Sequence, residues 1–328
     1  MRGRQLVSFS GSSPPSMEPS PLCSLCGYLR RRSEWGRELE VQWDVPLASC
    51  TTFHIGGPAR CLVRPLTVDG VADVLCRSRE LGVPHLVLGG GSNVLAPDKP
   101  MEGVVVQLSR ACSEIRARRA GGRGFIEVQV GAGLRLSHLI RFCLENGLSG
   151  LEPLVAIPGT FGGAAVMNAG TREGCLADVL LWLDLLDEKG GRQRLSLRDL
   201  NPRYRSMGLP ADWTVVAGGV GLRPAPTEGM RSRLRAAVLR RKATQPSNRP
   251  SAGSVYKNPP EASAGWLIEN AGLKGYSVGG AVVSERHANW IINLGGATAA
   301  DVRAVMDHVE KSVYRAFGVC LEREILIL

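Results

Sequence analysis

The stretch VLGGGSNVL, residues 87–95, joins a short apolar run to three consecutive glycines, a serine and an asparagine. The apolar run is typical of a buried strand. Because glycine has no Cβ, the backbone that follows could approach a ligand closely. Successive backbone amides, with the Ser92 hydroxyl and the Asn93 amide, could form a nest for an anion such as a pyrophosphate. A tight turn without a ligand is the alternative. The stretch matches neither G-x-G-x-x-G nor a P-loop.

A second glycine-rich loop, AIPGTFGGAAVMNAG, occupies residues 156–170. Its four glycines again leave space beside the backbone, and Pro158 restricts the direction of the chain. Two such loops in one domain are less easily explained as unrelated turns. Together they predict a dinucleotide held between two glycine-rich loops.

The composition indicates an ordinary globular protein of 328 residues, with 44% apolar and 21% charged residues. A chain of this length can form two or three domains. It contains no run of 18 apolar residues, so no membrane partner is expected. Aromatic residues make up only 5%, which is sparse for platforms that stack bases.

The formal net charge is +10, and 34 of the 40 basic residues are arginines. The densest basic stretch, residues 231–250, could face nucleic acid, a phosphorylated small molecule or plain solvent. Since aromatics are few and no nucleic-acid motif is present, a nucleic-acid partner is not expected.

Nine cysteines are scattered along the chain without a disulfide framework. Only Cys23 and Cys26 form a C-x-x-C pair, and no second pair completes a zinc site. We therefore expect no metal and a reducing, cytoplasmic location. Residues 1–42 are rich in Ser, Pro and Arg and lack a secretory signal, so they are expected to form a disordered extension. Met17 is an alternative start.

Hydrophobic periodicity predicts an α+β chain that becomes ordered near Trp43. The prolines and glycine of residues 223–229 suggest a domain boundary near residue 225. We therefore expect a domain at 43–225 and a smaller one at 226–328. Strands are predicted at 59–65, 83–90, 103–108, 125–133, 180–190, 213–222 and 320–328, and helices at 68–82, 137–148, 231–242 and 298–318.

The stretch PSAGSVYKNP, residues 250–259, places Ser254 after a glycine but outside the G-x-S-x-G elbow of nucleophilic serines. Ser254 is therefore either a loop hydroxyl with a local capping role or a proton carrier of another kind.

From about residue 45 to the end, the chain resembles the UDP-N-acetylenolpyruvoylglucosamine reductase (MurB) family, in its shorter type II branch. GGGSN alone is shared with a wider superfamily of flavoproteins, whereas PSAGSVYKNP with the other blocks is highly specific. The blocks, in family order, are TTFHIGGPA (51–59), LVLGGGSNVL (86–95), IPGTFGGAAVMNAG (157–170), YRSM (204–207), PSAGSVYKNP (250–259), VSERHANWIIN (283–293) and LEREI (321–325).

The resemblance implies a two-lobed α+β FAD-binding domain of the PCMH-type flavoprotein fold, followed by a smaller α+β substrate domain folded across the flavin. NADPH would reduce bound FAD, which would reduce the enolpyruvyl ether of UDP-N-acetylglucosamine to UDP-N-acetylmuramate. The GGGSN block has no His or Cys, so the FAD is expected to be non-covalent. The expected cofactor-binding residues are Gly89, Gly90, Gly91, Ser92, Asn93, Pro158, Gly159, Thr160, Gly163, Ala164 and Asn168.

Three positions match the catalytic residues of the family. Ser254 would be the general acid that protonates carbon after hydride delivery. Arg205 would clamp the pyruvyl carboxylate and oppose the enolate charge. Glu324 would lie near the same group, and it can do so only if protonated or sharing a proton, so we predict a raised pKa. Glu322 is the alternative, on the same strand face.

The resemblance also implies residues that contact the substrate. The distance of Lys242 from Ser254 matches a family lysine that meets the UDP phosphates, which makes part of the basic stretch a substrate funnel. Tyr204 would border the substrate, and Lys257 and Asn258 would aid polarisation and binding. His287 is expected to be a structural histidine.

Two departures from the family pattern concern substrate positioning and the chain end. The family block is usually Y-R-x-S, and Met207 stands where that serine belongs. Ser206 cannot replace it if this segment is a strand, since neighbouring strand residues point to opposite faces. The tail after Glu324 is shorter than is usual.

Two alternative functions are a flavin oxidoreductase with another acceptor and a non-catalytic relative that binds a flavin or nucleotide sugar. A monomer is expected.

Overall fold

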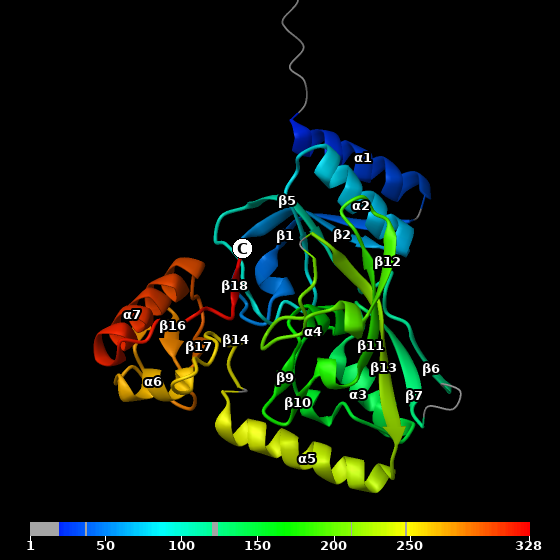
Figure 1. Ribbon diagram of the computed structural model, residues 1–328. Coiled ribbons are helices and arrows are strands. Elements are labelled where there is room, and N and C mark those ends of the chain that lie inside the picture. Colours follow the sequence, from blue (N-terminus) through cyan, green and yellow to red (C-terminus); the bar gives the residue numbers. More distant parts are fainter. Residues whose placement is uncertain (1–19, 37, 120–123, 211, 247) are drawn as a thin grey trace, which may run out of the picture.

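The computed structural model describes residues 20–36, 38–119, 124–210, 212–246 and 248–328. The chain builds an N-terminal domain of two lobes, each around its own sheet, and a smaller C-terminal domain beside them (Figure 1). Residues 1–19, including the alternative start at Met17, lie outside the described residues. None of the described helices is long and apolar enough to cross a membrane.

The first lobe is a four-stranded sheet covered by two helices. Its strand order is β1 (Leu39–Pro46), β2 (Pro58–Pro65), β5 (Met101–Val106), β3 (His85–Val87), with β1 antiparallel to β2 and the other pairs parallel. Helix α2 (Val68–Glu80) begins where Thr67 accepts a hydrogen bond from the amide of Gly70. Val71, Val74 and Leu75 form its buried face, at the spacing that predicted this helix.

Helix α1 (Pro21–Gly36) differs from the expectation of a disordered extension over residues 1–42. Leu25 and Leu29, one helical turn apart, are fully buried in the main core. The Tyr28 hydroxyl donates a hydrogen bond to Asp73 of α2 at 2.6 Å. These few apolar residues hold the segment in place although its overall composition is typical of disorder.

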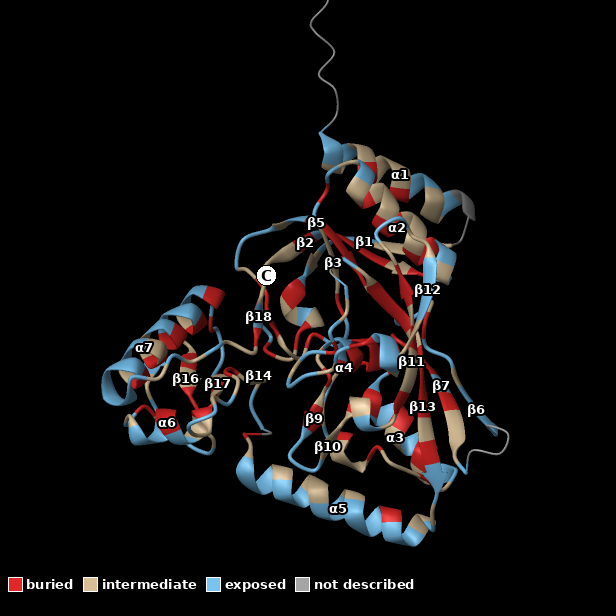
Figure 2. Ribbon diagram, in the orientation of Figure 1, coloured by how far each residue is buried: buried red, intermediate tan, exposed pale blue. Residues whose placement is uncertain are grey.

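The second lobe is an antiparallel sheet in the order β12 (Arg192–Ser196), β11 (Leu180–Leu186), β13 (Thr214–Pro224), β7 (Ile126–Gly131), β6 (Ile115–Arg119), with β8 (Leu148–Ser149) at the end of β13. Helices α3 (Leu136–Glu145) and α4 (Phe161–Val166) pack on it. The hairpin of β9 (Gly170–Thr171) and β10 (Gly174–Cys175) extends from it, and one hydrophobic core joins both lobes (Figure 2).

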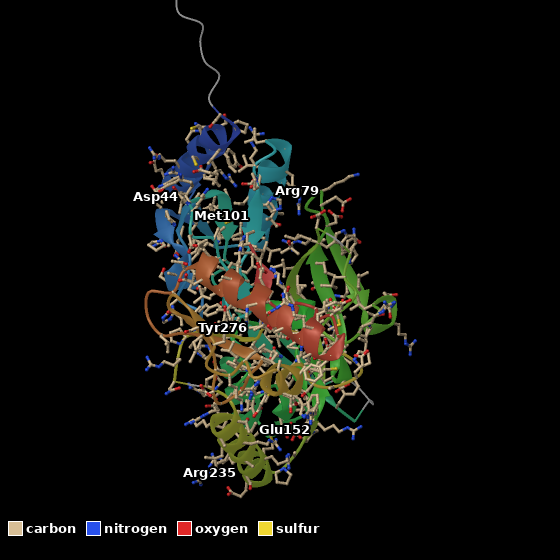
Figure 3. All side chains as sticks on the ribbon, turned by 90° about the vertical axis from the view of Figure 1, so that its left-hand side faces the viewer. Asp44, Arg79, Met101, Glu152, Arg235 and Tyr276 are labelled. Atoms are coloured by element: carbon tan, nitrogen blue, oxygen red, sulfur yellow. The ribbon has the colours of Figure 1, made fainter. Side chains whose placement is uncertain are left out.

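Helix α5 (Thr227–Thr244) is longer than the predicted helix at 231–242 and packs on α3 and on the short helical turn Glu152–Leu154. It lies at the end of the molecule opposite α1, and Arg235 projects from it (Figure 3). By its contacts α5 belongs to the second lobe, not to the C-terminal domain expected from residue 226. We infer that the domain boundary follows α5.

The C-terminal domain is a small antiparallel sheet with two helices. The strand order is β14 (Ser251–Ser254), β17 (Trp290–Asn293), β16 (Ala281–Val283), β15 (Ser277–Val278), packed with α6 (Ala264–Asn270) and α7 (Ala299–Phe317). Its core also includes Phe53, Ile55 and Leu95 from the first lobe, so the two domains share apolar contacts. Asp98 of the first lobe accepts hydrogen bonds from the amides of Ala299 and Ala300, which begin α7.

The end of the chain does not form the single strand predicted at 320–328. Only β18 (Leu326–Ile327) is a strand, and it pairs in parallel with β4 (Val94–Leu95), directly after GGGSN. Just before it, Arg323 forms a bridge with Tyr256. The segment changes partner between the two domains, which prevents a continuous strand.

Replacing Leu29 with Ala should lower the free energy of unfolding by about 2–5 kcal/mol, because a fully buried side chain would be lost from the core. Urea unfolding of the full chain measures the change. Arg31→Ala, at an exposed position of α1, is the matched control and should leave stability nearly unchanged. Equal stability of the Leu29→Ala protein and its parent would contradict the packing of α1.

Candidate active site

The two glycine-rich loops lie directly against each other. A Cβ added to Gly90 would come within 2.6 Å of the Gly159 Cα, and one added to Gly89 within 2.7 Å of the Thr160 Oγ1. The Ser92 hydroxyl donates to the carbonyl of Pro158 at 3.1 Å. The structure therefore brings together the loops that the sequence predicted to share one dinucleotide.

The backbone of these loops is open to a ligand. Gly89, Gly90 and Gly163 are exposed. Within the described part of the chain, the amides of Gly89, Gly90 and Ser92 have no hydrogen-bond acceptor. Unpaired amides beside residues without a Cβ form a cradle that suits a pyrophosphate. The residues present therefore fit a bound dinucleotide.

Three of the expected cofactor residues also have structural roles. The Thr160 hydroxyl caps α4 by accepting from the amide of Gly163, and Ala164 is buried in the core. Asn168 is buried; its side chain donates to the carbonyl of Arg203 at 3.2 Å and accepts from the amide of Ala177 at 3.0 Å. Asn168 thus connects the second glycine loop to the turn that carries Arg205.

Arg205 lies in a tight turn and not on a strand. Arg203 and Ser206 exchange backbone hydrogen bonds at 2.7 and 3.1 Å, and Arg205 adopts a φ of 59°. Left-handed backbone is unfavourable for a residue with a side chain and is typical of functional sites. Ser206 uses its hydroxyl to accept from the amide of Gly208, and Met207 is fully buried in the core. Ser206 therefore lies in a turn, and the prediction that it points away because it lies on a strand is wrong.

Arg205 and Glu324 form an ion pair although 119 positions separate them in the chain. The Arg205 Nε donates to the Glu324 Oε1 at 2.6 Å, and only 21% and 12% of the two side chains are exposed. The Arg205 guanidinium also donates to the carbonyl of Gly170 at 3.3 Å. The structure thus brings together two of the three predicted catalytic residues.

Both backbone polar groups of Glu324 form hydrogen bonds that hold the residue in place. Its amide donates to the carbonyl of Val255 at 2.7 Å, one residue after Ser254. The Asn93 side chain donates to the carbonyl of Glu324 at 3.0 Å. Burial raises the pKa of Glu324, while Arg205 and Lys257 oppose the shift. The net direction is the one predicted from the sequence.

The alternative carboxylate, Glu322, is exposed and pairs with Lys257 at the surface. The backbone amide of Lys257 also donates to the carbonyl of Glu322. This ion pair occupies the Lys257 ammonium, and Lys257 lies outside the cavity described next.

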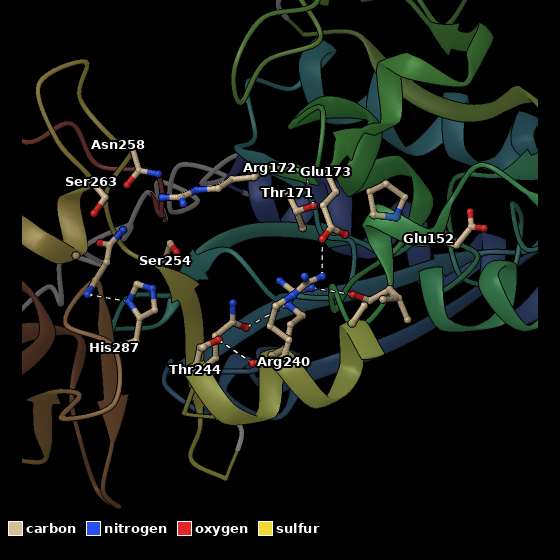
Figure 4. A pocket seen from close by; sticks show the side chains of 17 residues that line it. Glu152, Thr171, Arg172, Glu173, Arg240, Thr244, Ser254, Asn258, Ser263 and His287 are labelled. Carbon is tan, nitrogen blue, oxygen red and sulfur yellow. Dashed lines mark hydrogen bonds and ion pairs between the residues drawn. The ribbon is translucent and has the colours of Figure 1, made fainter. Parts of the chain in front are cut away.

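A cavity of about 570 Å³ lies between the C-terminal domain, α5 and the β9–β10 hairpin (Figure 4). Ser254, at the end of β14, faces it together with Asn258 and His287. Within the described residues no hydrogen bond joins the Ser254 hydroxyl to a carboxylate or an imidazole, the base that a nucleophilic serine would need.

Arg205 and Glu324 do not line this cavity, but two contacts connect them to it. The Tyr204 hydroxyl lies 3.4 Å from the amide of Asn258, and the Arg205 guanidinium lies over the Tyr204 ring at 4.9 Å. Asn258 also accepts from the amide of Ala264 at 3.0 Å. Tyr204 therefore connects the second lobe to the C-terminal domain beside the cavity.

The cations that α5 presents to the cavity are Arg240 and Arg241, not Lys242. Lys242 is exposed and only its backbone carbonyl is used, by Arg286. The lining residues Ala237, Arg240, Arg241 and Thr244 follow the i, i+3, i+4, i+7 spacing of one helical face. This spacing is present in the basic stretch and could have identified the cavity-facing side of α5 from the sequence.

Arg241 is half-buried, and among the residues that the structure describes it donates only to neutral groups, the Val155 carbonyl and the Gln245 side chain. Burial and the charge of Arg205 lower the pKa of Arg241. His287 accepts from the amide of Asn289 through Nδ1, and burial lowers the pKa of His287, which favours the neutral ring. Three arginines (Arg172, Arg240 and Arg241) and two carboxylates (Glu152 and Glu173) line the cavity, so its charged side chains carry a small positive excess, which suits an anionic ligand.

The comparisons with known proteins agree with this geometry. Residues 59–196 match an FAD-binding domain model, and residues 245–328 match the C-terminal domain of UDP-N-acetylenolpyruvoylglucosamine reductase. A reductase of that name from Syntrophobacter fumaroxidans is 51% identical over 89% of this chain and 85% of its own length. One from Moorella thermoacetica is 42% identical over 93% and 97%. The crystal structure of the Thermus caldophilus reductase (MurB) matches with a TM-score of 0.72 and 35% identity, over 88% of this chain and 98% of that chain.

The fold and the glycine cradle define an FAD-binding oxidoreductase, which confirms the predicted α+β architecture with a PCMH-type flavin domain. More narrowly, the chain belongs to the UDP-N-acetylenolpyruvoylglucosamine reductase family.

Replacing Gly90 with Ala should greatly reduce the FAD retained per chain, because the new Cβ would collide with Gly159 and separate the two loops. The ratio of flavin to protein absorbance after purification measures retention. Gly229→Ala in α5, an exposed helical site, is the control and should keep the parental FAD content. Full FAD retention by the Gly90→Ala protein would contradict the shared cradle.

Proposed function

We propose that this chain reduces the enolpyruvyl ether of UDP-N-acetylglucosamine to UDP-N-acetylmuramate in peptidoglycan precursor synthesis, with FAD bound non-covalently and NADPH as the reductant. The observation that carries the proposal is the partly buried Arg205–Glu324 pair. The backbone of Glu324 is hydrogen-bonded to Val255, next to Ser254, and to the Asn93 side chain of the GGGSN loop. Membership of the reductase family supports it.

Bound FAD would supply the hydride chemistry, and this chain's own residues would bind, orient and protonate the substrate. Arg205 carries the guanidinium for the enolpyruvyl carboxylate and for the charge that develops on reduction. A protonated Glu324 beside it could share a proton with that group instead of repelling it. The Ser254 hydroxyl faces the cavity and would deliver the proton to carbon.

The finer features of the proposal rest on particular observations. The nine cysteines are all free thiols, as is usual in the reducing cytoplasm. The arginine-lined cavity supports a small anionic substrate as the partner, not nucleic acid or a membrane. Met207, which stands where the family has a serine, is buried in the core. The Arg205–Glu324 pair forms without that serine hydroxyl.

Anaerobic visible spectra test the function. In the parent, NADPH should bleach the flavin bands, and added UDP-N-acetylglucosamine enolpyruvate should restore them. Ser254→Ala should still bleach with NADPH, but substrate should restore the bands about 100- to 10,000-fold more slowly, since a general acid typically contributes that much.

Three results would contradict these assignments. A parent that bleaches but never recovers with this substrate is a flavin oxidoreductase with another acceptor. A chain that stays colourless with added FAD is a non-catalytic relative. A Ser254→Ala protein that loses bleaching by NADPH has lost something other than a proton donor.

The pH dependence should report Glu324. Because burial raises its pKa, the carboxyl stays protonated to higher pH than usual and ionises as the pH rises further. We expect kcat/KM of the parent to fall as the pH rises through that pKa. Glu324→Gln, which cannot ionise, should be slower and should lack this fall.

Glu322→Gln is the matched control, since Glu322 is exposed and two residues away. It should keep the fall of kcat/KM with rising pH. If Glu322→Gln removes the fall and Glu324→Gln keeps it, the titrating group has been assigned to the wrong residue.

A further inference from the structure

The cavity contains one ion pair that the proposed chemistry does not use. The Arg240 Nη2 on α5 lies 2.5 Å from the Glu173 Oε1, at the tip of the β9–β10 hairpin, and both side chains line the cavity (Figure 4). The base of the same hairpin provides the Gly170 carbonyl that holds Arg205. The pair therefore connects α5 to the hairpin across the side of the cavity.

The two carboxylates that line the cavity are in different situations. Glu152 accepts hydrogen bonds from Arg233, from Ser149 and from the amide of Gly150. Burial opposes its charged form, but these bonds outweigh burial and lower the pKa of Glu152 to about 2. Glu173 has the Arg240 guanidinium as its charged partner, at a position that is largely exposed.

The Glu173–Arg240 pair is weak enough to be exchanged. Its side chains are 51% and 61% exposed, and exposed ion pairs contribute little to stability because water screens them. A phosphate group offers Arg240 a stronger, bidentate partner. In the proposed function the substrate carries a diphosphate, and α5 presents Arg240, not Lys242, to the cavity.

We propose that Arg240 binds the diphosphate of the nucleotide substrate and that Glu173 holds Arg240 in the empty enzyme until the diphosphate displaces the carboxylate. This inference rests on the proposed function. Glu173 then acts as a selectivity residue, because it competes with every anion for Arg240. Only a ligand with enough negative charge and a further anchor displaces it effectively.

Titration calorimetry of the oxidised, FAD-loaded enzyme tests the exchange, with UDP as the charged probe and uridine as the uncharged one. Glu173→Gln removes the competing carboxylate and should lower the Kd for UDP by about 2- to 5-fold, the range expected from one exposed ion pair. Arg240→Gln should raise this Kd roughly tenfold or more, because a charge-assisted hydrogen bond is lost. Neither variant should alter the Kd for uridine.

The double variant separates this exchange from a general change in charge. Adding Glu173→Gln to Arg240→Gln should have no further effect on the Kd for UDP, since Glu173 acts only through Arg240. Glu80→Gln, which removes an exposed carboxylate paired with Arg77 on α2, is the control and should bind UDP like the parent.

Equal UDP binding by the parent and by Glu173→Gln would overturn the exchange while leaving the proposed function standing. The same holds if Glu173→Gln tightens UDP equally with and without Arg240. If neither UDP nor uridine binds the parent, the nucleotide-sugar function itself is wrong, and the exchange is wrong with it.

Discussion

The site depends on the backbone hydrogen bonds of a short segment near the end of the chain. In residues 322–328 the amide of Glu324 bonds to Val255 of the C-terminal domain, and the amide of Leu326 bonds to Asn93 of the first lobe. Bonds of this kind tolerate little displacement, because each buried amide left without an acceptor costs free energy. Glu324 is therefore held at the junction of both domains, where the Arg205 turn of the second lobe can reach it.

The same junction explains the properties of the Arg205–Glu324 pair, which we propose to be catalytic. Burial between the domains makes ionisation of Glu324 costly, while Arg205, itself held in a left-handed turn, favours it. Asn168 and the carbonyl of Gly170 hold this turn and the guanidinium in place. Strained backbone, a shifted pKa and a partly buried ion pair thus occur together, as expected where a structure gives up stability for chemistry.

Much of the framework could be predicted from the sequence, because periodicity and caps are local properties. Helices α2 and α7 and the strands β2, β3, β5, β7, β11 and β13 appear where apolar spacing placed them, whereas β1, β6 and β12 were not predicted. Helix α1 was missed, since few apolar side chains, chiefly the fully buried Leu25 and Leu29, carry its packing in a segment of disorder-like composition. The pairing of Arg205 with Glu324 could not be derived locally; only the family resemblance brought these residues together. Which face of α5 meets the cavity also required the fold, although the spacing of Ala237, Arg240, Arg241 and Thr244 was present in the sequence.

The contact between Asn93 and Glu324 has a thermodynamic consequence. The loop that we propose as the dinucleotide cradle is also the loop that docks the C-terminal segment, through Asn93 and β4. A ligand that orders this loop favours docking, and by reciprocity a docked C-terminal domain must tighten the ligand by the same factor. We therefore expect the apoprotein to differ from the holoprotein far from the flavin, in the hydrogen-exchange protection of α7 as well as around the glycines.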